Sequence, residues 1–137
     1  GHHSGQMAFP GGKMDPTDTD LRETAAREVW EEIGVEIDSA SLNYVTEHWI
    51  NVSNYWITAF SVRINKKLSY DLNKREINRI FEIPVSFFQD PANIIPFEVS
   101  YDGNKILSPS FTYEGNLIWG ATALIMYQLF HQEDNSK

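Results

Sequence analysis

The pattern of hydrophobic and polar positions divides the chain into a short extended segment, a helix, a strand-rich middle and a final helix. Apolar residues at helical spacing predict helices, and runs dense in aromatic and β-branched residues predict strands. The expected elements are helices over 21–33 and 119–130, one helical turn over 85–88, and strands over 42–50, 55–64, 77–83, 97–101 and 105–107. We therefore expect an α/β protein of the α+β type, a mixed sheet with helices packed on it, in a single domain over residues 1–137.

The first helix carries both of its boundary signals. Asp20 is placed to cap the N-terminus, Glu23 follows at capping-box spacing, and Gly34 is placed to end the helix. Apolar residues recur at intervals of four and predict a core-facing stripe of Leu21, Ala25, Val29 and Ile33.

Two further sets of residues are expected in the core. The last helix has an apolar side made of Ala123, Met126, Tyr127 and Phe130. Aromatic residues in the strands suit either a core or the stacking of an adenine, and the core interpretation is favoured for Tyr44, Trp49, Tyr55, Trp56 and Phe60. The residues Asp102-Gly103-Asn104 predict a hairpin turn between two of the strands.

Composition and charge narrow the possible functions. The 137 residues include 19 Asp and Glu against 11 Lys and Arg, a net charge of -8 that disfavours a nucleic acid polymer as partner. The sequence has no Cys, which excludes disulfides, thiolate metal sites and a cysteine nucleophile. No apolar run approaches the roughly 20 residues that cross a bilayer, so no membrane partner and a cytoplasmic location are expected.

The segment Arg27-Glu28-Val29-Trp30-Glu31-Glu32-Ile33-Gly34-Val35 carries the candidate chemistry. At about 100° per residue, Glu28, Glu31 and Glu32 share one arc of about 100° on the helix surface. Three carboxylates so placed repel one another, but clustered carboxylate oxygens are the ligands that Mg²⁺ and Mn²⁺ prefer. Arg27 is adjacent and can orient a carboxylate through a bidentate pair.

A solvated acidic helix face is the ordinary explanation for such residues. The context favours a site instead. Gly11 and Gly12 end the first extended segment, fifteen residues before Arg27 when counted from Gly12. Glycines there leave room for the backbone to approach a metal-bound phosphate.

These residues together resemble the Nudix box, the signature of the Nudix hydrolases. The box reads Gly, five residues, Glu, seven residues, then Arg-Glu-apolar-any-Glu-Glu-any-Gly-apolar. In this chain Gly12 is followed after five residues by Asp18 and, after eight more, by Arg27. The two departures, Asp for Glu and one extra spacer residue, weaken any role for Asp18 and leave the helix half of the signature intact.

The chain also resembles the coenzyme A pyrophosphatase branch of that family. Gly5-Gln6-Met7-Ala8-Phe9-Pro10-Gly11-Gly12 fits the end of the branch's second signature, Gly, three residues, Phe-Pro-Gly-Gly. The Asp18 form of the loop is similar to the branch as well, with looser likeness at 76–84 and 118–123. Gly1-His2 has two explanations, a tag remnant or native sequence, whereas residues 3–6 resemble the branch and are taken as native.

The resemblance implies a Nudix-like α/β/α sandwich that hydrolyses a phosphoanhydride in a nucleoside diphosphate linked to another group, with Mg²⁺ or Mn²⁺ as cofactor. It implies metal ligands at Glu28, Glu31, Glu32 and the Gly11 carbonyl, and catalytic roles for Arg27, Glu28 and Glu31. For Glu28 two roles are left open, metal ligand and general base. The preferred substrate is coenzyme A; the alternatives are ADP-ribose, NADH or a nucleotide sugar, and a non-catalytic binding or regulatory module.

Several expectations stay open. A later carboxylate often assists in the family, and Glu76, Glu98 and Glu114 are unranked candidates, each more often a surface residue. His48 has no second His at metal spacing and favours a structural role. The branch's upstream arginines and first strands are absent, so a missing N-terminal segment is expected. The sheet edge left unpaired would invite association, which makes a homodimer one arrangement open to the chain.

Overall fold

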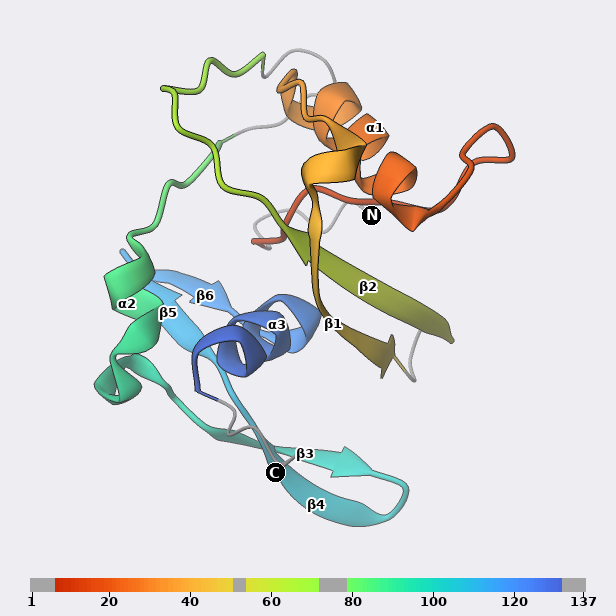
Figure 1. Ribbon diagram of the computed structural model, residues 1–137. Helices are drawn as coiled ribbons and strands as arrows, with labels where there is room; N and C mark the ends of the chain where they lie inside the picture. Colours follow the sequence, from red (N-terminus) through yellow and green to blue (C-terminus); the bar gives the residue numbers. More distant parts are fainter. Residues whose placement is uncertain (1–6, 51–53, 72–78, 132–137) are drawn as a thin grey trace, which may run out of the picture. The chain divides into compact units, whose positions relative to one another are not determined.

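The computed structural model describes residues 7–50, 54–71 and 79–131 (Figure 1). Helices and antiparallel strands alternate along the chain, which confirms the α+β class. The elements in order are α1 (Leu21–Ile33), η1 (Ser39–Ser41), β1 (Asn43–Ile50), β2 (Tyr55–Ser61), α2 (Val85–Gln89), η2 (Pro91–Asn93), β3 (Phe97–Tyr101), β4 (Asn104–Ser108), β5 (Phe111–Tyr113), β6 (Asn116–Ile118) and α3 (Gly120–Phe130).

The chain divides into two compact units, which are described separately. One unit contains Phe9–Glu47 and Thr58–Phe81; the other contains Gly1–Ala8, His48–Ile57 and Glu82–Lys137. The antiparallel hairpin of β1 and β2 contributes residues to both units. The expectation of a single domain over 1–137 stays a prediction.

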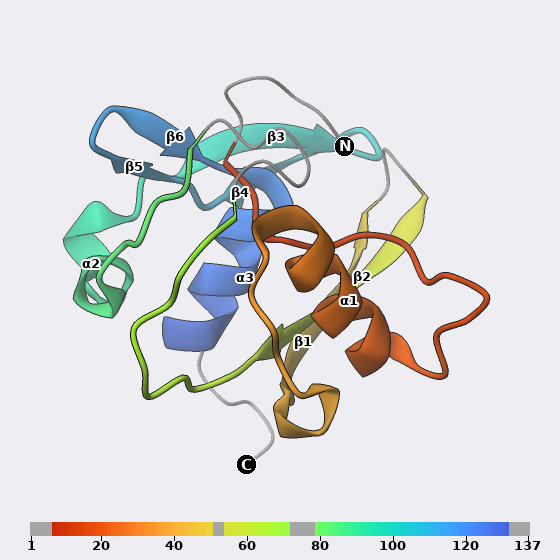
Figure 2. The same ribbon diagram turned by 90° about the horizontal axis from the view of Figure 1, so that it is seen from above.

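Helix α1 has the boundaries that the sequence predicts. The Asp20 side chain accepts a hydrogen bond from the Glu23 N–H, and Gly34 ends the helix in the left-handed region at φ 72° with its N–H donating to the Trp30 carbonyl. Glu23 reaches one residue further back than a capping box requires, because its carboxylate accepts from the Thr19 N–H and hydroxyl. In Figure 1 and Figure 2 the loop before α1 extends away from the helix and then turns back to join the first turn of α1.

The predicted core stripe of α1 is wrong in its detail. The buried positions of this helix are Thr24 and Glu28, whereas Leu21 is 45% exposed and Ala25, Val29 and Ile33 are partly buried. The helix therefore buries the polar side that contains Glu28 more completely than its apolar stripe. A buried carboxylate needs a specific partner, which directs attention to the site.

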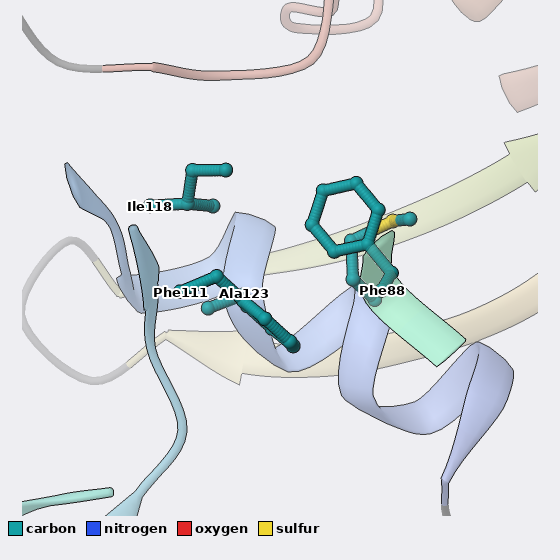
Figure 3. Packing of buried hydrophobic residues seen from close by; sticks show 5 residues of the cluster. Phe88, Phe111, Ile118 and Ala123 are labelled. Atoms are coloured by element: carbon teal, nitrogen blue, oxygen red, sulfur yellow. The ribbon is translucent and has the colours of Figure 1, made fainter. Parts of the chain in front are cut away.

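The other unit is built around an aromatic and aliphatic cluster. Phe88 of α2, Phe111 and Ile118 of the β5–β6 hairpin, and Ala123 and Met126 of α3 form this core (Figure 3). The Phe88 and Phe111 rings meet edge to face at 5.1 Å between centroids. Burial of Ala123 and Met126 agrees with the predicted apolar side of the last helix, while Tyr127 and Phe130 are partly buried.

Two tight turns in this unit have the same geometry. In the β3–β4 hairpin Tyr101 pairs with Asn104, and the two residues between them, Asp102 and Gly103, have φ values of 54° and 81°. Glu114 and Gly115 link β5 to β6 with φ values of 49° and 80°. Positive φ at both central residues is the type I′ geometry that matches strand twist. The sequence predicts the first turn, but Glu114 gives no such signal for the second.

The strand predictions are partly wrong. Strand β2 ends at Ser61 instead of residue 64, and residues 79–83 of the segment expected as a strand are not in one; residues 77 and 78 lie outside the described residues. The described strands form three two-stranded sheets, of which β3–β4 and β5–β6 are antiparallel by register, and β1 and β2 run in opposite directions in Figure 1. The described strands therefore contain no parallel pair, which the expected mixed sheet would need. A β-rich sequence forms a strand only where a neighbour supplies hydrogen bonds, and none of the described strands pairs with 79–83.

The aromatic residues of β1 and β2 are less buried than predicted. Tyr44, Trp49, Tyr55 and Trp56 are 41–65% exposed, and Phe60 is partly buried beneath the Arg22 guanidinium. The core interpretation is therefore wrong for four of the five. None of the helices in the described parts of the chain has the length and apolar character needed to span a bilayer.

Candidate metal centre

The acidic face of α1 is organised around Arg27. The Arg27 Nη1 lies 2.9 Å from Glu28 Oε1 and 3.1 Å from Glu31 Oε1, so one nitrogen bridges two carboxylates. Their positions one turn apart on the helix make this possible. The bridge offsets the repulsion that these two negative charges would otherwise exert on each other.

Glu28 lies directly against the glycine loop. The residue is 7% exposed, and a Cβ built on Gly12 would lie 2.5–2.8 Å from its carboxylate atoms. Such distances are below any ordinary contact, so any side chain at position 12 would displace the carboxylate. Gly12 is required here by close approach.

Glu32 contacts the same loop one residue earlier. Its Oε2 accepts a hydrogen bond of 2.8 Å from the Gly11 N–H. A Cβ on Gly11 would meet nothing within 4 Å, which distinguishes it from Gly12. Two of the three carboxylates therefore contact the Gly11–Gly12 loop, and the third, Glu31, is held by Arg27.

The residue that sequence reasoning undervalued is Asp18. Its side chain is 3% exposed and accepts hydrogen bonds from the Asp15 N–H at 2.8 Å and the Thr24 hydroxyl at 2.9 Å. Arg27 donates to it through Nε at 3.1 and 3.3 Å and through Nη2 at 3.0 Å. The expectation that the sequence departures weaken a role for Asp18 is wrong, because the side chain is the principal anchor of Arg27.

The electrostatics agree with this geometry. The Arg27 guanidinium first, and then the Asp15 N–H, lower the pKa of Asp18 from 3.8 to about 2. Burial opposes them with an effect larger than the further lowering by the Thr24 hydroxyl. In return, Asp18 first, and then Glu31 and Glu28, raise the pKa of Arg27. Both groups are therefore charged at neutral pH. A signal for this pairing was available in the sequence, as an acidic residue nine positions before an arginine in a Nudix-like signature.

The donor set suits a divalent cation in its chemistry. Hard carboxylate oxygens come from one helix face, and Glu28 presents its carboxylate to a loop where Gly12 leaves space. In the described residues no three Asp, Glu or His side chains lie close enough to hold an ion between them. Closing a ligand set around a cation would therefore require the three carboxylates of Glu28, Glu31 and Glu32 to come closer together than they are here. The assignment of Glu28, Glu31, Glu32 and Gly11 as ligands stays a prediction.

The other candidate residues make no contact with the Arg27 cluster in the part of the chain that the structure describes. Glu76 lies outside the described residues, Glu98 forms an exposed ion pair of 3.6 Å with Lys105, and Glu114 occupies the β5–β6 turn. Burial lowers the pKa of His48, and its Nε2 is buried with no hydrogen-bond partner among the described atoms. A neutral imidazole in β1 is consistent with the structural role expected for His48.

Comparison with known proteins assigns this arrangement to a family. A family model described as "NUDIX domain" matches residues 1–90, and the chain belongs to the Nudix family. Nudix hydrolases generally use divalent metal ions and act on small-molecule substrates.

Similar proteins include three that carry the name "Uncharacterized Nudix hydrolase NudL". That of Photorhabdus laumondii is 32% identical over 130 residues, which cover 95% of this chain and 70% of the relative. Those of Escherichia fergusonii (31% over 127 residues, 93% and 66%) and Yersinia enterocolitica (30% over 130 residues, 95% and 67%) are comparable. The chain thus spans about two thirds of the length of these relatives, whose names support a pyrophosphohydrolase enzyme.

Proposed function

We propose that this protein is a metal-dependent hydrolase of a phosphoanhydride, with coenzyme A as substrate and phosphopantetheine and adenosine 3′,5′-bisphosphate as products. The observation that carries the proposal is the Glu28 carboxylate, which lies against Gly12 on the same helix face as Glu31 and Glu32. Clustered carboxylates beside a glycine loop suit binding of a diphosphate together with divalent cations.

The residues of the chain have separate tasks in this proposal. Glu28, Glu31 and Glu32, with the Gly11 carbonyl, hold Mg²⁺ or Mn²⁺. A cation bound there neutralises phosphate oxygens and lowers the pKa of a bound water. Arg27 sets the directions of Glu28 and Glu31 through Nη1. Glu28 serves as a ligand or as the general base that accepts the proton of the attacking water.

A purely binding module is disfavoured by the same geometry. Three carboxylates on one helix arc repel one another, and Arg27 offsets part of this repulsion through its contacts to Glu28 and Glu31. A module without a cation to bind would gain stability by losing one of these charges. The arrangement is therefore better suited to catalysis with bound metal than to recognition alone.

The choice of coenzyme A rests on sequence features. The Gly5-x3-Phe9-Pro10-Gly11-Gly12 segment and the Asp18 form of the loop resemble the coenzyme A pyrophosphatase branch. The relatives' names give no substrate. A homodimer and a cytoplasmic location also stay predictions from the sequence.

A substrate panel tests the proposal. The full chain is assayed with coenzyme A, dephospho-coenzyme A, ADP-ribose, NADH and a nucleotide sugar, in Mg²⁺ and in Mn²⁺, and the products are identified by mass. We expect the highest kcat/KM for coenzyme A, with a loss for dephospho-coenzyme A because its 3′-phosphate is missing. A tenfold preference for ADP-ribose or NADH, about 1.4 kcal/mol of discrimination, would replace the substrate and keep the metal site. No hydrolysis of any compound would favour the binding module.

A further inference from the structure

Asp18 is saturated with hydrogen bonds from three directions. The loop supplies the Asp15 N–H, the helix supplies the Thr24 hydroxyl, and Arg27 supplies two of its nitrogens. The side chain is 3% exposed, so these groups replace water around it. A buried carboxylate in this setting fixes its partners strongly, because any displacement leaves polar groups unsatisfied.

The partner that matters for the metal centre is Arg27. Its guanidinium is planar and rigid, so fixing two nitrogens also fixes the direction of the third. Asp18 holds Nε and Nη2, and the Lys13 carbonyl accepts from Nη2 as well, at 3.0 Å. Nη1 is thereby directed toward Glu28 at 2.9 Å and Glu31 at 3.1 Å. Asp18 acts on the metal ligands through Arg27 without touching them.

The side chain and the spacer at this position are matched in length. The Nudix box has Glu followed by seven residues, whereas this chain has Asp18 followed by eight before Arg27. One methylene fewer in the side chain accompanies one residue more in the backbone, and all the Asp18 contacts are 2.8–3.3 Å. A Glu at position 18 would bring an extra methylene into a space already filled by Thr24 and Arg27.

We propose that Asp18 is a positioning residue for the metal centre and that its side-chain length is matched to the eight-residue spacer before Arg27. The Glu that the Nudix signature has at this position would therefore disturb the metal centre of this chain. The inference rests on the proposed function, because it assumes that Glu28 and Glu31 bind a divalent cation. It concerns how the ligands are held and is independent of which diphosphate is hydrolysed.

The test compares Mn²⁺ affinity, measured by electron paramagnetic resonance, between the unchanged chain and four variants. Asp18→Asn and Asp18→Glu should each weaken Mn²⁺ binding by roughly 10-fold to 100-fold, the range found when outer partners of metal ligands are removed. Asp18→Glu combined with deletion of Thr19 restores the family spacing and should recover most of that loss. Asp15→Asn removes one negative charge from the same loop without removing a contact to Arg27, so its affinity should stay within about twofold.

The outcomes test two claims separately: the positioning role of Asp18, and the match between its side-chain length and the spacer. Mn²⁺ binding within twofold of the unchanged chain for Asp18→Asn would overturn the positioning role. Equal weakening by Asp18→Glu with and without the Thr19 deletion would overturn the length matching. If Asp18→Asn does not give a folded circular dichroism spectrum, Thr24→Val decides instead: it keeps the shape of the residue and removes the 2.9 Å bond to Asp18, and it should weaken binding about threefold. Unchanged binding by Thr24→Val would then overturn the proposal.

Different results would contradict the proposed function. An unchanged chain that binds no Mn²⁺ at millimolar concentration would overturn the metal centre and the inference together. A chain that binds Mn²⁺ and hydrolyses no diphosphate would overturn the hydrolase alone, and the variants would still report on Asp18 through their Mn²⁺ affinity.

Discussion

At the scale of single residues, the site depends on what Gly12 lacks. The buried Glu28 carboxylate occupies the space where a Cβ at position 12 would lie, at 2.5–2.8 Å. Glycine pairs in a loop commonly suggest backbone flexibility, but here the glycine provides volume for one particular side chain. The sequence predicts that Gly11 and Gly12 are near the carboxylates; it does not predict that only the second is sterically essential.

Gly12→Ala should therefore displace Glu28 and lower kcat by on the order of 10²-fold, since a misplaced catalytic group or ligand costs about that much. Stability should change little, because the displaced group is the end of a flexible side chain. Gly11→Ala is the matched comparison: its added Cβ meets nothing within 4 Å, and the loss should be much smaller. Steady-state kinetics with thermal melting of both variants provides the measurement. Equal losses in the two variants would show that close approach to Glu28 is not the cause.

The role of Asp18 shows why residue-level prediction was incomplete. The sequence shows a shorter acidic side chain and a longer spacer as two separate departures from the Nudix signature. In the structure they compensate each other, because the carboxylate reaches Arg27 at 3.0 Å. Compensation between side-chain length and backbone length is a three-dimensional property, and spacing rules treat the two independently.

At the scale of elements, α1 was predicted best because its ends are encoded locally. Asp20 caps it and Gly34 ends it, each through contacts within four residues. Its packing face was predicted poorly, because the periodicity of Leu21 and Ala25 says nothing about the loop that covers Glu28 instead. The segment 79–83 illustrates the converse: strand-like composition, but no described partner strand.

Gly34→Ala tests the end of α1. Ala in the left-handed region costs about 1–2 kcal/mol, and its Cβ would lie 2.7 Å from the Asp71 Cβ, so the free energy of unfolding should fall by about 2 kcal/mol or more. Gly34→Asn separates the two causes, since Asn tolerates this φ but carries the same Cβ. Urea unfolding followed by circular dichroism measures both. We expect Asn to lose at least about 1 kcal/mol; near-normal stability of the Asn variant would contradict the contact with Asp71.

At the scale of the whole molecule, the charge of the chain and its family both support a site for divalent cations. A chain with a net charge of -8 brings Glu28, Glu31 and Asp18 to one arginine, with Glu32 beside them on the same helix. This arrangement favours divalent cations over anions at the acidic face of α1. The match of the NUDIX domain model to residues 1–90 supports the same chemistry independently of the geometry. The acidic motif and the family were predictable from sequence because they depend on short spacings. The β3–β4 hairpin was predictable for the same reason, through its Asp102-Gly103 turn, whereas the β5–β6 hairpin was not, because Glu114 at its turn gives no such signal.

Metal dependence of hydrolysis is the most direct test of the central claim that the acidic face of α1 is the metal centre of a diphosphate hydrolase. Product release from coenzyme A, or from the best substrate of the panel, is measured in Mn²⁺ and in EDTA for the unchanged chain and for Glu31→Gln. The account predicts activity that vanishes in EDTA and returns with Mn²⁺ or Mg²⁺, and a rate for Glu31→Gln lower by on the order of 10² or more, because a charged ligand is lost while its shape is kept. Turnover by Glu31→Gln near that of the unchanged chain, or hydrolysis that persists in EDTA, would contradict it.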